Sequence, residues 1–220
     1  MLKFENHTSM KKKWLLLLFQ IVIGCSVYAQ QAKGINRLPH LKGGDLLFEV
    51  SPTDNMITDV TQGIDGLKID HVAIYWNKQV IEATKNKGVA ISDLEDFINR
   101  NTQADGRVWI LVGRVTSDYH LRKTIKRAKS FIGLPYDSLF LPDNQAIYCS
   151  ELVQKSYVDK KNRLIFSPIP MSFHDASGNV TDYWKAFYRR FDMEVPEGEP
   201  GTNPGELSRR KNVEIIWRFF

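Results

Sequence analysis

The segment "DHVAIYWNKQVIEAT", residues 70–84, constrains the fold more than any other stretch of the chain. Two strand-like runs flank Asn77 and Lys78, and asparagine tolerates the left-handed backbone that a two-residue turn requires. The pattern predicts a β-hairpin in which Tyr75 lies opposite Val80. An antiparallel pair with this register can belong only to a fold that contains an antiparallel sheet.

The predicted register places His71 and Glu82 on the same face of the hairpin as diagonal neighbours. Their backbones are then about 7–8 Å apart, which is within side-chain reach. Glu82 is expected to accept a hydrogen bond from one ring nitrogen and to leave the other free. Each residue alone also fits a purely structural role. The opposite face is expected to be core and carries Val72, Ile74, Trp76, Ile81 and Ala83.

The rest of the chain alternates between strand-like and helix-like segments. Strands are predicted over 43–50, 89–92, 107–115 and 213–220, and a basic amphipathic helix is predicted over 117–133. A short helix is expected over 52–64, with Asp54 as its N-cap and Gly63 as its end. A second helix over 92–100 is expected to open with a capping box of Ser92 and Glu95. The mixture predicts an α+β fold with an antiparallel sheet.

The N-terminal residues 1–29 have the layout of a secretory signal, with three adjacent lysines, an apolar run and then small residues. The run Trp14–Ile23 is too short to span a membrane comfortably. Two processing routes are open: cleavage after Ala29, or lipidation of Cys25 in the lipobox-like letters VIGC. Both routes predict an exported protein, periplasmic or in the cell envelope, with one domain over 38–220.

The positive charge belongs mainly to this signal. The whole chain carries a formal +5, and residues 1–29 hold four of the 30 basic residues and one of the 25 acidic ones. The remaining chain therefore has 26 basic and 24 acidic residues, a net +2. This balance does not favour a nucleic-acid partner.

Cys149 has no partner for a disulfide within the mature chain, because Cys25 is either removed or lipidated. An unpaired thiol in an exported protein is a reactive group, an intermolecular partner or a buried inert side chain. The residues after Cys149 have helical spacing, which puts the thiol in the first turn of a helix. Unpaired N–H groups and the helix dipole favour the nucleophilic thiolate there.

A nucleophilic cysteine needs a base, and four histidines follow residue 29. His71 has Glu82 beside it, whereas His40 and His120 are expected at the surface. His174 is the competing base, in a loop next to Asp175. The chain lacks the C-x-x-C, H-E-x-x-H and G-x-S-x-G motifs and a phosphate-binding glycine loop, so neither a metal nor a cofactor is expected. A metal held by Cys149 and His71 is the minor alternative.

Four motifs occur in the order "GDLLF", "DHVAIYW…QVIEA", "LPYDSLF" and "YCSELVQKSY". This order resembles the YiiX/YebB-like cysteine hydrolases, the permuted papain-like branch of the NlpC-type superfamily of cell-wall hydrolases. The resemblance implies a circularly permuted papain-like fold, with the sheet packed against a helix that carries the nucleophile. It implies Cys149 as nucleophile, His71 as base and Glu82 as the orienting residue. It also places Tyr136 and Asp137 in the substrate cleft.

The resemblance predicts a cysteine hydrolase of the amidase or peptidase type, acting on a cell-wall peptide or another amide. An acyl-lipid amidase, esterase or acyltransferase with the same mechanism is one alternative, and a binding module without turnover is another. The expected partner is a small peptide, amide or acyl-lipid substrate, with membrane attachment only through a lipidated Cys25. The tail, residues 166–220, is expected to cover the cleft or to brace the sheet.

Overall fold

The computed structural model describes residues 39–142 and 145–220. The predicted signal segment, with Cys25 and Ala29, lies outside the described residues. Among the residues that the structure describes, none belongs to a helix long and apolar enough to cross a membrane.

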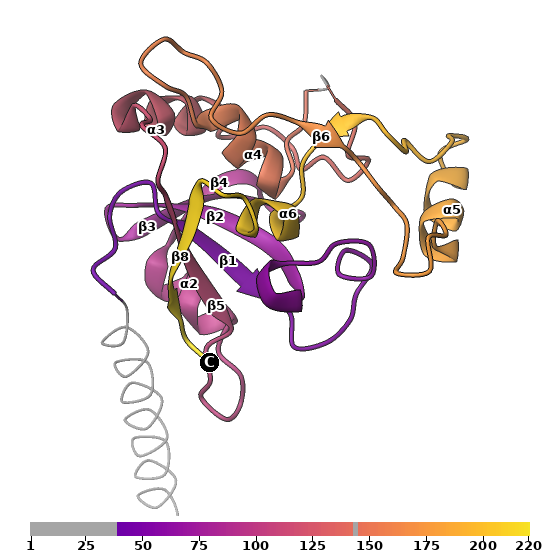
Figure 1. Cartoon of the computed structure of the whole chain (residues 1–220), viewed down its shortest axis with the longest axis horizontal. Helices are drawn as coiled ribbons and strands as arrows, with labels where there is room; N and C mark the ends of the chain where they lie inside the picture. Colours follow the sequence, from indigo (N-terminus) through magenta and orange to yellow (C-terminus); the bar gives the residue numbers. More distant parts are fainter. Residues whose placement is uncertain (1–38, 143–144) are drawn as a thin grey trace, which may run out of the picture. The chain divides into compact units, whose positions relative to one another are not determined.

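A six-stranded antiparallel sheet forms the centre of the fold (Figure 1). Its strand order is β4-β3-β2-β1-β5-β8, so the sequence-adjacent strands β1 to β4 are also neighbours in space. The α+β prediction is therefore confirmed. The strands are β1 (Leu46–Val50), β2 (Ile69–Trp76), β3 (Gln79–Thr84), β4 (Gly88–Asp93), β5 (Ile110–Val115) and β8 (Val213–Arg218).

The hairpin of β2 and β3 has the predicted register. Tyr75 pairs with Val80, and both turn residues, Asn77 and Lys78, have positive φ angles of 51° and 62°. This backbone matches the twist of the flanking strands, as expected for a two-residue hairpin turn. The turn therefore sets which side chains of β2 and β3 face each other.

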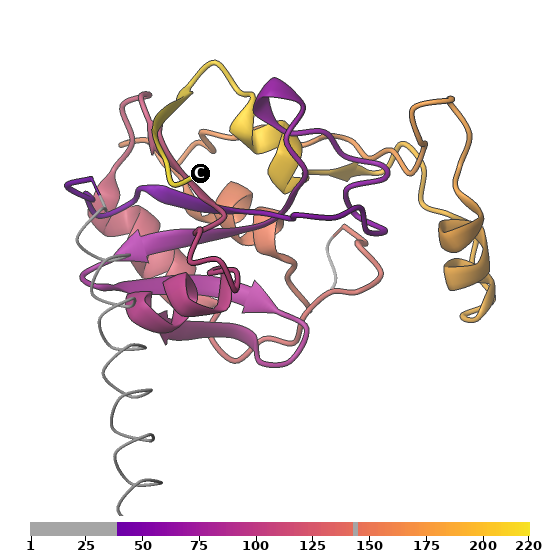
Figure 2. The ribbon, with the colours of Figure 1, turned by 90° about the horizontal axis from the view of Figure 1, so that it is seen from below.

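Most of the helices pack against this sheet or against one another, whereas the helix over 182–189 belongs to a separate cluster in the tail. The helices are η1 (Ile64–Gly66), α2 (Leu94–Arg100), α3 (Leu121–Ser130), α4 (Cys149–Ser156), α5 (Asp182–Arg189) and α6 (Pro204–Ser208). α4 lies against β2 and β3, with α3 beside it (Figures 1 and 2). Leu152 and Val153 of α4 join Phe48 and Ile74 of the sheet in one buried apolar cluster.

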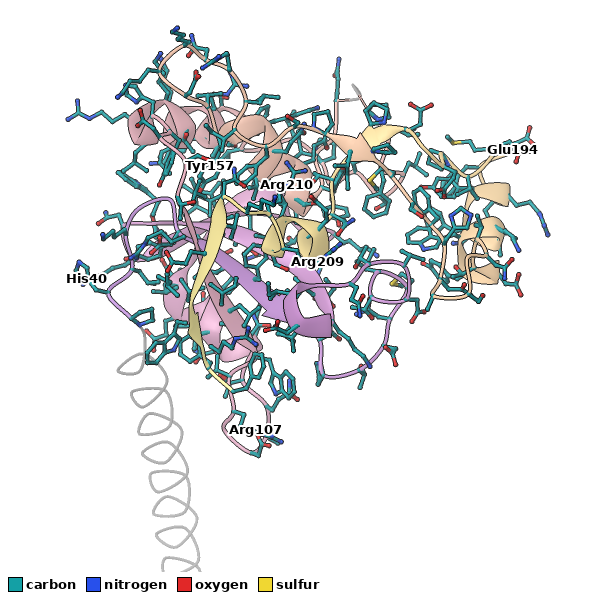
Figure 3. All side chains as sticks on the ribbon, viewed as in Figure 1. His40, Arg107, Tyr157, Glu194, Arg209 and Arg210 are labelled. Carbon is teal, nitrogen blue, oxygen red and sulfur yellow. The ribbon has the colours of Figure 1, made fainter. Side chains whose placement is uncertain are left out.

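Hydrogen bonds at the C-terminal end of α4 fasten it to its neighbours. The Tyr157 hydroxyl donates to the Gly44 carbonyl at 2.5 Å, just before β1, and Tyr157 is labelled in Figure 3. Arg127 of α3 donates through two nitrogens to the Lys155 carbonyl, at 2.9 and 2.8 Å. The helix that starts at Cys149 is thus held at its far end by two separate elements.

The helix predicted over 52–64 does not form, and the prediction was wrong. The Asn55 side chain accepts hydrogen bonds from the backbone N–H groups of Ile57 and Thr58, at 2.9 and 3.1 Å. A side chain that binds its own backbone in this way stabilises a turn in competition with a helix. Asp54, the predicted N-cap, instead forms an ion pair with Lys68 at 2.7 Å.

The helix predicted over 92–100 forms, but its predicted capping box does not. α2 begins after Asp93 as N-cap, and that residue makes no side-chain capping bond. Ser92 belongs to β4, where it pairs with Val80. The strand continues past the serine, so Ser92 is not available as the cap.

The C-terminal tail builds a second cluster of buried aromatic side chains. The short strands β6 (Ile169–Pro170) and β7 (Pro200–Gly201) pair with each other, and α5 lies between them in the chain. Two hydrogen bonds tie α5 to earlier loops: Trp184 Nε1 donates to the Met56 carbonyl at 3.1 Å, and the Tyr188 hydroxyl to the Leu139 carbonyl at 2.8 Å. Glu194, labelled in Figure 3, lies at the outer end of this tail region.

The loop that leads towards Cys149 is positioned against β4 by a close backbone approach at Gly88. The Val89 N–H donates to the Leu134 carbonyl at 2.9 Å, and the Val89 carbonyl accepts from the Gly133 N–H at 2.9 Å. Gly88 has a φ of 64°, and a Cβ there would lie 2.2 Å from the Leu134 carbonyl oxygen. A side chain at Gly88 would therefore force the loop away from the strand.

Replacing this glycine should destabilise the fold. Gly88→Ala adds both left-handed strain and a backbone clash, and we expect it to lower the free energy of unfolding by about 3 kcal/mol. Gly178→Ala is the matched control, because its φ is 82° but nothing lies within 4 Å of the added Cβ. It should cost only about 1 kcal/mol. Urea unfolding of both variants measures the difference, and equal losses would contradict the packing argument.

Candidate active site

Cys149 is the first residue of α4 and is 4% exposed. Two backbone hydrogen bonds hold the chain before it. The Ile147 N–H donates to the Pro135 carbonyl at 3.0 Å, and the Ile147 carbonyl accepts from the Asp137 N–H at 3.3 Å. Behind it, the Ser150 hydroxyl donates to the Thr202 carbonyl at 3.2 Å. The thiol is thus held at the positive end of the helix by the loop on one side and the tail on the other.

His71 lies between Cys149 and Glu82. Its Nε2 is 2.9 Å from Glu82 Oε2, as the predicted hairpin face requires. The Cys149 side chain also acts on this ring and raises the pKa of the imidazole. Because Nε2 is engaged with the carboxylate, Nδ1 is the ring nitrogen left for the sulfur. The structure therefore brings together the side chains of Cys149, His71 and Glu82, as the sequence predicted.

Arg100, at the end of α2, braces the carboxylate from behind. Its guanidinium contacts both oxygens of Glu82, at 2.9 and 2.5 Å, in the two-pronged geometry that arginine and carboxylate favour. The same guanidinium donates to Glu49 Oε1 at 3.1 and 2.7 Å, and stacks 4.5 Å from the centre of the Phe97 ring. Glu82, whose side chain is 2% exposed, is held on both sides.

These contacts shift the protonation of both partners. Burial by itself lowers the pKa of His71, but the charge of Glu49, the hydrogen bonds with Cys149 and Glu82 and the charge of Cys149 outweigh it. They hold the pKa of His71 well above its ordinary value of 6.5. Burial raises the pKa of Glu82, yet the bonds and charges of His71 and Arg100 hold it far below its usual range. The pair is therefore imidazolium and carboxylate at neutral pH.

Sequence reasoning did not single out Glu49 or Arg100. Glu49 pairs with His71 across β1 and β2, and its charge acts on the imidazole. Asp70, the residue before His71, instead accepts a hydrogen bond from Asn55 at 2.7 Å, and burial raises its own pKa. Glu49 could have been found only from the pairing of β1 with β2, which places it opposite His71. No local pattern identifies Arg100, since it reaches the site through the packing of α2.

A metal ion does not fit the ligand-like groups at this site. The potential donor atoms of Glu49, His71 and Glu82 lie within 4.8 Å of one another. However, the guanidinium of Arg100 already occupies both carboxylates, and a cation would have to displace it. Both carboxylates are therefore already neutralised by the arginine without a metal ion.

The structure places the two predicted cleft residues differently. Tyr136 lines the cleft on both sides of the thiol, and burial holds the pKa of its hydroxyl well above the ordinary value, which keeps it a donor. Asp137 is turned into its own loop, where its carboxylate accepts from the backbone N–H groups of Leu139, Phe140 and Leu141 at 2.8–3.0 Å. Contrary to the expectation of a substrate contact, Asp137 shapes the loop that carries Tyr136.

The competing histidines lie elsewhere. His174 Nδ1 is 3.1 Å from both Ser172 and Glu197, within the tail. His120 is the N-cap of α3, where its Nδ1 accepts from the Lys123 N–H at 3.4 Å. His40 is exposed. Among the histidines of the described residues, His71 alone contacts the Cys149 side chain in this structure.

Two hollows meet at this constellation. One is polar and is lined by His71, Glu82 and Arg100 among others. The other lies beside Cys149 and is lined largely by apolar side chains from the tail and the 57–61 segment. Ile57, Asp70 and Tyr136 line both, so the contact between thiol and imidazole lies where the two join.

Comparison of the sequence with models of protein families shows to which family the chain belongs. Residues 40–217 match the family of permuted papain-like amidase enzymes YaeF/YiiX, the C92 peptidases. The chain belongs to this family. The predicted resemblance is thus confirmed, and the protein is a cysteine hydrolase with the permuted papain-like fold.

A solved relative of this C92 amidase supports the fold. The chain resembles the crystal structure of the metalloprotein yiiX from Escherichia coli O157:H7 with a TM-score of 0.61 and 22% identity. The match covers 80% of this chain and 97% of that one. The curated proteins with which the sequence was compared include no match.

Replacing the Glu82 carboxylate, which bonds to the imidazole of His71, should change the pKa of His71. In the unfolded chain His71 titrates near 6.5, so the stabilisation from its charged form is fully present below that pH. This stabilisation is lost as the pH rises through the higher pKa that His71 has in the folded protein. Glu82→Gln should lower the pKa of His71, because burial, which opposes the charge, remains. NMR titration of the imidazole resonances measures this shift.

Glu206→Gln is the matched control for that titration. Glu206 also pairs with an arginine, Arg210, at 2.7 Å, but it lies on α6 and not beside His71. The His71 titration should be unchanged in this variant. An unchanged titration in Glu82→Gln as well would contradict the orienting role of the carboxylate.

Proposed function

We propose that the protein hydrolyses an amide bond through a triad of Cys149, His71 and Glu82. The single observation that carries the proposal is the position of the His71 ring, which interacts with the Cys149 side chain and is held by Glu82 through Nε2 at 2.9 Å. This is the arrangement of nucleophile, base and orienting group that covalent acyl transfer requires.

In the proposed reaction, the Cys149 thiolate attacks the carbonyl carbon and forms a tetrahedral intermediate. The imidazolium of His71 then donates its Nδ1 proton to the leaving nitrogen, the C–N bond breaks, and the acyl group remains on sulfur as a thioester. Water then loses a proton to the neutral imidazole and attacks the thioester. The carboxylic acid leaves, and the thiolate and imidazolium are restored.

The negative oxygen of the intermediate needs donors. The N–H of Cys149 is in the first turn of α4, where backbone donors have no partner within the helix. The Tyr136 hydroxyl, protonated and in the same cleft, is proposed as the second donor. Such preorganised donors are commonly worth about 10²–10³ in rate.

We further propose that the substrate is an amide met outside the cytoplasm. The signal-like residues 1–29 support export, and the superfamily resemblance supports a cell-wall peptide as the first class to test. An acyl amide or ester is the second class, and the apolar side of the cleft favours it. Both classes use the same thioester chemistry.

Loss of the nucleophile should abolish turnover. Cys149→Ala should reduce amide hydrolysis by at least about 10⁴-fold, since covalent catalysis is removed. His71→Ala should both lower turnover and slow alkylation of Cys149 by iodoacetamide. Product formation followed by mass spectrometry, with muropeptides and acyl amides as substrates, provides the measurement.

His174→Ala is the control, because that histidine pairs with Glu197 in the tail. It should leave both rates near those of the wild type. Hydrolysis that survives Cys149→Ala would remove the mechanism. Thiol alkylation at the rate of free cysteine in both wild type and His71→Ala, with no turnover, would support a binding module instead.

Export predicts a defined mature N-terminus. Expression of the full chain in a bacterial host should yield a protein that begins at Gln30, or a lipid-modified form that begins at Cys25. The intact mass of the purified protein distinguishes these two forms. A mass that retains residues 1–29, in protein from the soluble cytoplasmic fraction, would contradict export.

A further inference from the structure

The polar hollow beside His71 contains most of the free space at the site. Its volume is about 530 Å³, within the range of about 300–1,000 Å³ that is typical of sites for small molecules. The hollow beside Cys149 has a volume of only about 30 Å³, which is room for little more than a water molecule. Of the two hollows, only the polar one can therefore hold a group as large as an amino acid.

The chemistry of acyl transfer assigns the polar hollow to the leaving group. In the proposed reaction the leaving nitrogen takes its proton from His71, so this nitrogen lies beside the imidazole. His71 lines the polar hollow and Cys149 does not, whereas Cys149 lines the other hollow and His71 does not. The part of the substrate that departs with the nitrogen therefore extends into the polar hollow.

The acidic side chains of the polar hollow already have partners within the protein. Glu49 and Glu82 share the guanidinium of Arg100. Asp70 accepts a hydrogen bond from Asn55 at 2.7 Å, and burial raises the pKa of Asp70. The negative charge of this wall is thus largely compensated before any substrate binds.

The basic side chains of Lys85 and Lys87 are not compensated in this way. Both lysines lie in the turn between β3 and β4, are exposed and line the polar hollow. Within residues 39–142 and 145–220, neither side chain forms a hydrogen bond or an ion pair. Their two ammonium groups are therefore the charges of this hollow that remain available to a ligand.

The turn is close enough to the imidazole for one leaving group to reach both. Glu82, which holds His71, is on β3, and Lys85 follows it by three residues. Three residues of extended chain span at most about 11 Å. A lysine side chain that folds towards the hollow shortens this span, so a group a few bonds beyond the leaving nitrogen can reach its ammonium.

We infer that the polar hollow is the subsite for the leaving group, and that the leaving amine carries an anionic group which Lys85 and Lys87 bind. This inference rests on the proposed function and names one part of its substrate. Lysine ammonium groups bind carboxylates and phosphates through charge-assisted hydrogen bonds. The anion is therefore the carboxylate of an amino acid or the phosphate of an amino-alcohol ester.

A series of amides that differ only in the leaving amine tests this inference. We suggest 4-aminobutanoate, 2-aminoethyl phosphate, 4-aminobutanamide and 1,4-diaminobutane as leaving amines. Each is joined to a hexanoyl and to an alanyl-γ-glutamyl group, which represent the two proposed substrate classes, and the released amine is quantified by mass spectrometry.

The anionic amines should be the best leaving groups in this series. Because one exposed ion pair is worth up to about 5-fold, two lysines should raise kcat/KM for the anionic amines about 10-fold above that of the neutral 4-aminobutanamide. The cationic amine should be poorer than the neutral one. The preference should shrink towards one in about 1 M salt, which screens exposed charges. The better of the two anionic amines identifies the source of the anion.

Removal of the two lysine charges should abolish this preference. In Lys85→Gln combined with Lys87→Gln, the ratio of kcat/KM between the anionic and neutral amines should fall from about 10 to about 1–2. The matched control is Lys126→Gln combined with Lys129→Gln, because these lysines are also exposed but lie on α3 and line neither hollow. This control should keep the ratio of the wild type.

Protection of the thiol gives a readout that requires no turnover. A leaving amine bound beside His71 should slow the alkylation of Cys149 by iodoacetamide. Half-maximal protection should need at least about 5-fold less 4-aminobutanoate than 4-aminobutanamide in the wild type. The two concentrations should become similar when both turn lysines are replaced by glutamine. Absence of protection by 4-aminobutanoate, or equal protection by both amines in the wild type, would overturn the inference.

The outcomes separate the two proposals. Cleavage that depends on Cys149 but is equally fast with anionic and neutral amines would overturn the anionic leaving group and leave the hydrolase intact. A preference that persists without the charges of Lys85 and Lys87 would do the same. Cleavage that is equal in wild type and Cys149→Ala, or absent with every amide, would overturn the proposed function, and the leaving-group subsite would fall with it.

Discussion

The buried carboxylate of Glu82 is the group on which the site depends. The Glu82 side chain is 2% exposed, and an ionised carboxylate so deeply buried costs several kcal/mol of free energy unless it is paired and hydrogen-bonded. Arg100 supplies the pairing charge with two contacts, and His71 supplies the third bond. The charge that makes the carboxylate tolerable in the sheet also fixes the orientation of the imidazole. The stability of the buried carboxylate and the geometry of the proposed triad are therefore set by the same contacts.

The thiol side of the site depends on the tail. Thr202 receives one hydrogen bond from Ser150 and gives another to Tyr148, the residues on either side of Cys149. Gly201, just before it, packs so tightly that a Cβ would lie 2.5 Å from Met171. A segment fifty residues away in sequence thus both holds the start of α4 and forms the wall of the apolar hollow. Changes in the tail should therefore affect substrate choice and thiol position together.

Predictions from the sequence succeeded where local rules dominate. The hairpin turn needs two residues that accept positive φ, and Asn77 and Lys78 supplied them, so the register that pairs His71 with Glu82 followed. They failed where a competing contact decided the outcome. Asn55 turned an expected helix into a turn by binding its own backbone. Asp137 turned its carboxylate inwards to three N–H groups, which no spacing rule reveals.

The sequence by itself determined the antiparallel hairpin, the helix that begins at Cys149 and the three residues of the proposed triad. These features depend on turn conformation, side-chain periodicity and the family motifs, all of which are written along the chain. Only the tertiary structure decided that Arg100 and Glu49 surround the carboxylate and that the tail gives the cleft an apolar side. Those features come from contacts between segments distant in the chain, and the strength of such contacts depends on burial, which exists only once the core has formed.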